Sequence, residues 1–202
     1  MPRTAGLRNL DTTQEIISIR ENVKALPNIK PRVLTERPKA EVVGELVHNQ
    51  IIHFACHGIS DSVDPSAGSL FLGEYKDDKP DTLTIRELAH IRHQLPQIAY
   101  LSACSTAEIT DTSLTNETIH IASAFQLLGF PHVIGTLWEA DNNCATEVAG
   151  SFYQALVEQL QPSGRTVNHD IVAYAMHRAI QKLRSKKPGN YIGWVPFVHI
   201  GA

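Results

Sequence analysis

The spacing of apolar positions along the chain predicts buried strands separated by helices. Three short runs are almost continuously apolar, which is typical of parallel strands covered on both faces. A fourth strand is expected at the end of the chain, where Pro196 suits an edge position. The four expected strands are Gln50–Cys56, Ile98–Ala103, His132–Leu137 and Trp194–Ile200.

Between these runs, apolar residues recur every three or four positions, as on one face of a helix. In the first such segment the recurring residues are Ile16, Ile17, Ile19, Val23 and Leu26. Strands that alternate with helices indicate βαβ units, so we expect one α/β domain with a mostly parallel sheet and helices on both faces. The expected helices are Thr13–Leu26, Pro38–His48, Thr84–Ala89 (capped by Thr82 or Thr84), Glu117–Leu128, Asn142–Gln159 and Asp170–Arg184.

The polar stretches predict the connections. Loops are expected at 58–68, 105–116 and 161–165, and a turn at Asp77–Asp81. Two brief apolar pieces remain: Ser69–Leu72 predicts a small strand or hairpin arm, and Arg32–Leu34 a short strand.

Composition narrows the class of protein. The chain has 202 residues, of which 43% are hydrophobic and 19% charged, as in an ordinary globular domain. The formal net charge of −3 and the lack of a basic stripe give no reason to expect nucleic acid. No run approaches the roughly 20 apolar residues that cross a bilayer, and three cysteines argue against a disulfide framework. We therefore expect a cytoplasmic protein that does not bind membranes.

Two reactive side chains follow two of the expected strands. His57 comes directly after the first buried strand, and Cys104 after the second. The carboxyl ends of parallel strands meet at one edge of a sheet, where functional groups gather. The 104 − 57 = 47 positions between the two residues suffice for one crossover, so the strands can be neighbours about 4.8 Å apart.

An imidazole beside a thiol can perform acyl transfer. The imidazole accepts the thiol proton or stabilises the thiolate, which then attacks a peptide carbonyl. The resulting oxyanion needs donors, and the backbone N–H groups of Gly58 and Cys104 could supply them. A cysteine at a strand end also occurs as a small buried hydrophobe, and a histidine beside it as an ordinary core or loop residue. Spacing alone leaves both interpretations open.

Longer stretches around the two residues resemble a known family. HFACHG at 53–58 and LSACSTA at 101–107 look like the two signatures of the CHAT domain, a caspase-like cysteine peptidase domain related to separases and caspases. SLFL at 69–72, the NE pair at 116–117, IASAFQLLGFPHVIGTLW at 121–138, FYQAL at 152–156 and WVPFVHIG at 194–201 extend the resemblance over nearly the whole chain.

The resemblance implies a caspase-like three-layer sandwich with Cys104 as nucleophile and His57 as general base and then acid. The protein would be a cysteine endopeptidase that cleaves a protein or peptide substrate through a thioester, in regulated proteolysis during signalling or defence, without metal or cofactor. The Q-A-C-x-G caspase motif is absent, so specificity for aspartate is not carried over. Family members have more chain before this segment, so residues 1–202 are expected to be the C-terminal domain of a longer protein, behind a regulatory domain such as tetratricopeptide repeats.

The segment after the third strand is a candidate for substrate binding. Trp138, Glu139 and Asp141 leave the sheet at the same carboxyl edge as His57. Glu139 or Asp141 could pair with a basic side chain, as a carboxylate does in separases. Alternatively, Asp141 or Asn142 caps the helix that follows.

The other cysteines and histidines have simpler explanations. Cys56 is expected to be core filler, and Cys144 to be structural or exposed, although a helix N-terminus could lower its pKa. A zinc site made of His53, Cys56, His57 and Cys104 is disfavoured, because a strand sends His53 and Cys56 to opposite faces. We expect no metal.

Two other classes of function are alternatives to a peptidase. One is a scaffold module that keeps the fold without activity, which would not need both His57 and Cys104. The other is a redox sensor that uses Cys104 as a switch. If the protein is a peptidase, loops 58–68 and 105–116 are expected to be poorly ordered until an upstream sensor orders them.

Overall fold

A four-stranded sheet forms the centre of the fold in the computed structural model. The structure describes residues 10–59, 61, 64–76, 79–102, 117–138, 140–161 and 166–201. The strand order is β1-β5-β6-β7, in which the first three strands are parallel and β7 is antiparallel to β6. The strands are β1 (Ile51–Phe54), β5 (Ile98–Leu101), β6 (His132–Thr136) and β7 (Phe197–Gly201). This arrangement confirms the expected mostly parallel sheet, with the strand after Pro196 at an edge.

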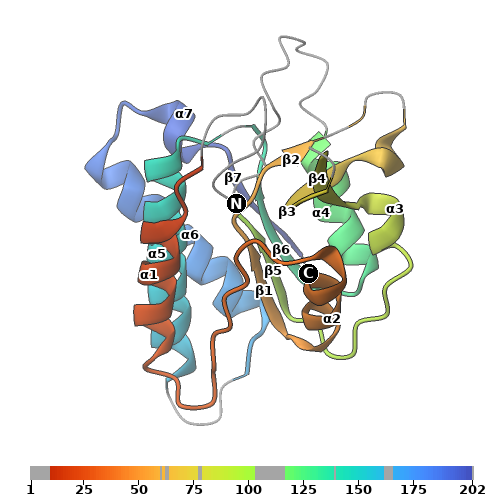
Figure 1. The fold of residues 1–202 in the computed structure, drawn as a ribbon. Coiled ribbons are helices and arrows are strands. Elements are labelled where there is room, and N and C mark those ends of the chain that lie inside the picture. Colours follow the sequence, from red (N-terminus) through yellow and green to blue (C-terminus); the bar gives the residue numbers. More distant parts are fainter. Residues whose placement is uncertain are drawn as a thin grey trace.

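Helices cover both faces of this sheet (Figure 1). On one side lie α1 (Thr13–Val23), α5 (Asn142–Leu160) and α6 (His169–Lys186). On the other side lie α2 (Lys39–His48), α3 (Ile85–Leu88) and α4 (Glu117–Leu127). The result is the three-layer α/β sandwich that the sequence predicted.

Two hydrophobic cores fill the spaces between the three layers. Successive side chains of a strand point to opposite faces. Tyr100 of β5 accordingly packs with Phe152 of α5, whereas the next residue, Leu101, belongs to the core that contains Phe125 of α4. All four side chains are fully buried, which explains why the central strands are apolar at nearly every position.

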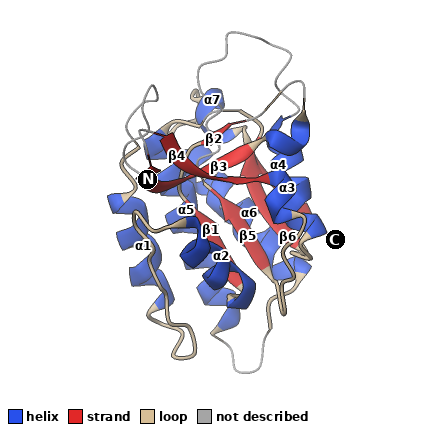
Figure 2. Ribbon diagram, turned by 45° about the vertical axis from the view of Figure 1, so that its right-hand side comes forward, coloured by secondary structure: helices blue, strands red, loops and turns tan. Residues whose placement is uncertain are grey.

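A second, antiparallel sheet lies across the upper end of the first (Figure 2). It consists of β2 (Gly58–Ile59), β3 (Ser69–Lys76) and β4 (Lys79–Thr84). The prediction of a loop throughout 58–68 was therefore wrong at its start, and Pro65–Ala67 form a short 3-10 helix. The predicted turn at Asp77–Asp81 was wrong for residues 79–81, which belong to β4.

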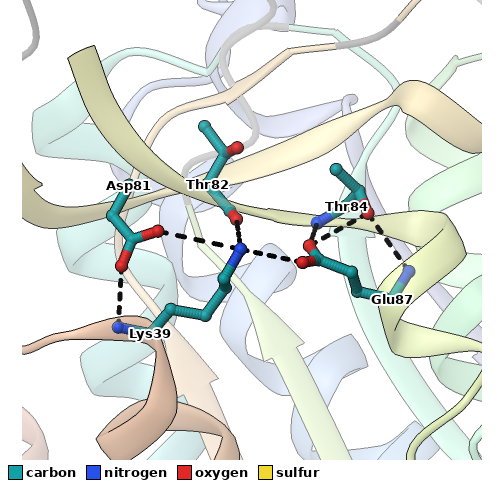
Figure 3. A network of polar contacts seen from close by, with 5 residues as sticks. All are labelled: Lys39, Asp81, Thr82, Thr84 and Glu87. Atoms are coloured by element: carbon teal, nitrogen blue, oxygen red, sulfur yellow. Dashed lines mark hydrogen bonds and ion pairs between the residues drawn. The ribbon is translucent and has the colours of Figure 1, made fainter. Parts of the chain in front are cut away.

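A polar network fastens the small sheet to α2 (Figure 3). The Lys39 ammonium donates to the carbonyl oxygen of Thr82 at 3.0 Å and to the carboxylate of Glu87 at 2.8 Å. The backbone N–H of Lys39 donates to Asp81 at 2.9 Å. Thr84 and Glu87 form a capping box that begins α3, so Thr84 is the cap, one of the two that the sequence allowed.

Other differences from the sequence prediction are local. Helix α1 ends at Val23, three residues before the predicted end, and Arg32–Leu34 is not a strand. A short helix that the pattern missed, α7 (Tyr191–Trp194), precedes β7. In the described part of the chain, no helix has the length and apolar character to span a membrane.

Candidate functional site

The strands β1 and β5 end level with each other. Their parallel register pairs Phe54 with Leu101. The backbone N–H of Ser102 then donates to the carbonyl oxygen of Phe54 at 2.9 Å. The chain segments that lead to His57 and to Cys104 therefore leave the sheet from adjacent points on its carboxyl edge.

The backbone at His57 is held by the small sheet. Its carbonyl oxygen accepts a hydrogen bond from the N–H of Phe71 in β3, at 2.8 Å. The residue is 4% exposed, so it is buried even though it is polar. The small sheet thus fixes the place where the chain turns away from β1.

Gly58 belongs to a non-hydrogen-bonded pair between β2 and β3. It lies opposite Leu70, and the bond between Phe71 and His57 flanks that pair. In this type of antiparallel pair, the N–H and C=O groups point away from the partner strand. The N–H of Gly58 is therefore directed away from β3, as a donor to an oxyanion would need to be.

Part of the predicted site lies outside the described residues. This applies to Cys104, to Glu139 and to the whole loop 105–116. The expectation that the loops are poorly ordered stays a prediction. Within 58–68, Asp64 forms an ion pair with Arg86 of α3 at 2.6 Å and accepts a hydrogen bond from Ser66.

The two described residues of the predicted substrate-binding segment have partners of their own. The Trp138 indole N–H donates to the carbonyl oxygen of Ile192 in α7 at 3.4 Å. The Asp141 carboxylate accepts from the backbone N–H groups of Asn143 and Cys144, both at 3.1 Å. The capping alternative for Asp141 is therefore confirmed, while binding of substrate by either residue stays a prediction.

A buried polar cluster lies beside the ends of β1 and β5. Glu15 of α1 is only 1% exposed. Its Oε1 atom contacts His53 Nε2 at 3.0 Å and is also hydrogen-bonded to Ser102 Oγ. A carboxylate can only accept, so His53 and Ser102 donate to it. The other ring nitrogen of His53, Nδ1, is hydrogen-bonded to the Tyr153 hydroxyl at 3.2 Å.

The surroundings keep Glu15 ionised. Burial is the largest single influence on the pKa of Glu15 and raises it. The hydrogen bond and electrostatic attraction of His53, together with the hydrogen bond from Ser102, outweigh burial and place the pKa below its ordinary value. A buried carboxylate is costly unless it is paired, and here the pairing is sufficient to hold the charge.

The sequence pattern did not predict this cluster as a unit. His53 was considered only as a zinc ligand, and Glu15 and Ser102 were not singled out. Among the described residues, no group of three or more metal-ligating side chains lies close enough to hold an ion. One local signal was available: Glu15 precedes Ile19 by four residues and Val23 by eight, which places it on the apolar face of its helix.

Two of the three cysteines are buried in the described structure. Burial raises the pKa of the Cys56 thiol to about 12, and Cys56 packs in the core beside α4, as expected of core filler. Cys144 lies at the start of α5, where burial and the charge of Asp141 raise its pKa. The idea that the helix N-terminus could lower the Cys144 pKa was therefore wrong, because desolvation and a nearby carboxylate dominate.

Comparison with protein-family models matches residues 7–202 to the CHAT domain. No curated protein matches the chain. The family match covers almost the whole sequence, including both candidate catalytic residues.

Proposed function

Because the chain belongs to the CHAT domain family, which comprises caspase-like cysteine peptidases, we propose that it is a cysteine endopeptidase with Cys104 as nucleophile and His57 as its base. The observation that carries the proposal is the level ending of β1 and β5. His57 follows Phe54 by 57 − 54 = 3 residues, and Cys104 follows Leu101 by 104 − 101 = 3 residues. Three residues of chain reach at most about 11 Å, so neither residue can lie farther than that from its own one of the two adjacent strand ends.

The proposed reaction begins with proton transfer from the Cys104 thiol to His57. The thiolate attacks the carbonyl carbon of a peptide bond, and the carbonyl oxygen becomes an oxyanion. The N–H of Gly58, which is directed away from β3, donates to that oxyanion together with the N–H of Cys104.

Three further proton transfers complete the cycle. The tetrahedral intermediate collapses, the C–N bond breaks, and His57 gives its proton to the leaving amine. The product is a thioester on Cys104. His57 then takes a proton from water as that water attacks the thioester. It gives this proton to the Cys104 sulfur as the C–S bond breaks, which releases the new carboxyl terminus and regenerates the thiol.

The substrate in this proposal is a protein or peptide, bound partly at the edge where β6 ends. Trp138 lies there, held by its hydrogen bond to α7, and Glu139 and Asp141 follow. Asp141 accepts hydrogen bonds from backbone N–H groups at the N-terminus of α5. Its negative charge lies at that edge and suits a basic side chain on the substrate. Regulation by an upstream domain is part of the same proposal, since family members carry such domains.

The test uses a peptide bearing a thiol-reactive electrophile and locates the modified residue by mass spectrometry. We expect labelling at Cys104, loss of labelling in Cys104→Ala, and a loss of about 100-fold or more in rate in His57→Ala. His90→Ala is the matched control, because His90 is exposed on the turn after α3 and should not affect the rate.

Two results would contradict the proposal. In one, Cys104 reacts no faster than a free thiol in the unfolded chain. In the other, His57→Ala and His90→Ala react at the wild-type rate, which would favour a scaffold without peptidase activity. Cleavage of a peptide library then identifies the residue preferred before the cut.

A further inference from the structure

The buried carboxylate of Glu15 has no role in the proposed chemistry, yet it lies beside it. Carboxylates are almost never fully buried unless they are paired, and an exposed glutamate would serve equally well in the first turn of a helix. Glu15 instead reaches across from α1 to residues of β1 and to the end of β5. The burial therefore requires an explanation beyond helix stability.

Helix α1 has other contacts that hold it against α5. Asn22 donates to the carbonyl oxygen of Gly150 at 3.1 Å, and the buried side chain of Val23 packs in the core with α5 and α6. The Asn142 amide also donates to the carbonyl oxygen of Asp11 at 3.1 Å. Because these contacts dock the helix independently, Glu15 is not needed merely to attach it.

What Glu15 adds is a tie to the end of β5. Ser102 donates through its hydroxyl to Glu15 and through its backbone N–H to Phe54. These two bonds fix both the side chain and the main chain of the residue two positions before Cys104. The other donor to Glu15, His53, is in turn held by Tyr153 and stacked against Tyr100, so the acceptor oxygen is itself fixed.

We infer that Glu15 is a positioning residue: its carboxylate, oriented by His53, holds Ser102 and so sets the point from which the chain leads to Cys104. This role rests on the proposed function. Positioning errors of about 1 Å can reduce the rate of a catalysed step by about 100-fold, so the tie between α1 and β5 matters for the reaction and not only for folding.

The test compares Ser102→Ala with Ser102→Thr in the same electrophilic-peptide assay. The alanine removes the donor to Glu15, whereas the threonine restores a hydroxyl. We expect Ser102→Ala to lower the maximal labelling rate of Cys104 by about 10- to 100-fold. The probe concentration that gives half the maximal rate should stay within about twofold of the wild-type value. Ser102→Thr should recover most of the rate. Ser185→Ala, at an exposed position in α6, is the matched control and should react as the wild type.

Substitutions of Glu15 give a second, independent pair of variants. Glu15→Gln places an amide oxygen where Oε1 accepts both bonds, so it should react within a few-fold of the wild type. Glu15→Met has a similar shape without an acceptor and should be slowed like Ser102→Ala. This pair also decides the question should Ser102→Ala not fold. Circular dichroism at the assay temperature establishes that each variant is folded.

The possible outcomes separate this role from the proposed function. If folded Ser102→Ala and Glu15→Met label at the wild-type maximal rate, the positioning role is wrong, even if their melting temperatures fall. His57-dependent labelling of the wild type would still support the peptidase. If wild-type labelling does not depend on His57, the proposed function fails and the positioning role fails with it.

Discussion

The ring of Tyr100 is stacked on the imidazole of His53, with centroids 4.6 Å apart and planes inclined by 17°. Tyr153 approaches the same imidazole differently, through its hydroxyl, 3.2 Å from Nδ1. The two tyrosines therefore contact one histidine, one by its face and the other by a hydrogen bond.

This difference predicts unequal effects of removing the two hydroxyls. Tyr153→Phe should lower the free energy of unfolding by about 1 to 2 kcal/mol, because it leaves Nδ1 of a part-buried imidazole without its partner. Tyr100→Phe should change it by less than about 0.5 kcal/mol, since no described residue hydrogen-bonds the buried Tyr100 hydroxyl. Urea unfolding of the two variants measures both values. Equal losses would show that the hydrogen bond to His53 carries no special weight.

The stability of the protein should depend on pH through Glu15. Its pKa is lower in the folded protein than in the unfolded chain, so the unfolded chain takes up the proton first as the pH falls. The stability contributed by ionised Glu15 is complete above about pH 4.3 and is lost as the pH falls further.

Glu15→Gln tests this dependence. The difference in unfolding free energy between the wild type and Glu15→Gln should shrink as the solution is acidified below that value. Glu21→Gln is the matched control, because Glu21 lies on the same helix with its side chain 62% exposed. If this difference for Glu15→Gln stays constant with pH, the pKa of Glu15 is not lowered in the folded protein.

The network that joins α2 to the small sheet should contribute to stability through Lys39. Lys39→Met removes the donor to Thr82 and Glu87, while it keeps the apolar stem of the side chain. We expect the free energy of unfolding to fall by about 1 kcal/mol, or Tm by about 2–4 °C. One of the lost hydrogen bonds goes to a backbone carbonyl, and the ion pair is only partly screened by solvent.

Lys24→Met provides the comparison. Lys24 pairs with Glu21 on the exposed face of α1, with both side chains more than 60% exposed. The loss should be below about 0.5 kcal/mol, as for other solvent-exposed pairs. Thermal melts of the two variants give both shifts in Tm. Equal shifts would show that the Lys39 network contributes no more than an exposed ion pair.

The two suggested roles of Asp141 can be separated by substitution. Asparagine caps a helix about as well as aspartate, whereas alanine costs about 1 kcal/mol. Asp141→Asn should therefore preserve Tm, and Asp141→Ala should lower it. If the carboxylate also binds a basic side chain of the substrate, Asp141→Asn should raise KM for peptides with Lys or Arg before the cut and leave kcat unchanged. An unchanged KM would leave Asp141 as a helix cap alone.

The three thiols should differ in reactivity in the native protein. Cys56 and Cys144 are buried, and their pKa values are raised, so both are protonated and shielded at neutral pH. Brief treatment with iodoacetamide should modify Cys104 and spare the other two, whereas all three should react in denaturant. Mass spectrometry of the digested protein gives the extent at each residue. Rapid native modification of Cys56 or Cys144 would contradict their burial.

The sequence by itself determined the sandwich, because each layer follows from local periodicity. Runs such as Ile98–Leu101 are apolar at every position, which is typical of a strand covered on both faces. Pro196 lacks an N–H and therefore marked the edge strand that follows it. The order of strands and helices placed His57 and Cys104 after two buried strands, and their roles came from the resemblance to a family.

The tertiary structure decided what depends on contacts between distant segments. On α1, Glu15 is buried and Ile17 is 48% exposed, the reverse of their hydrophobicities. Periodicity places Glu15 on the apolar face of its helix but cannot identify its partners, because they lie 38 and 87 residues away. The level ending of β1 and β5 and the small sheet that holds His57 likewise follow from strand register, which depends on pairing between segments that are distant in the sequence.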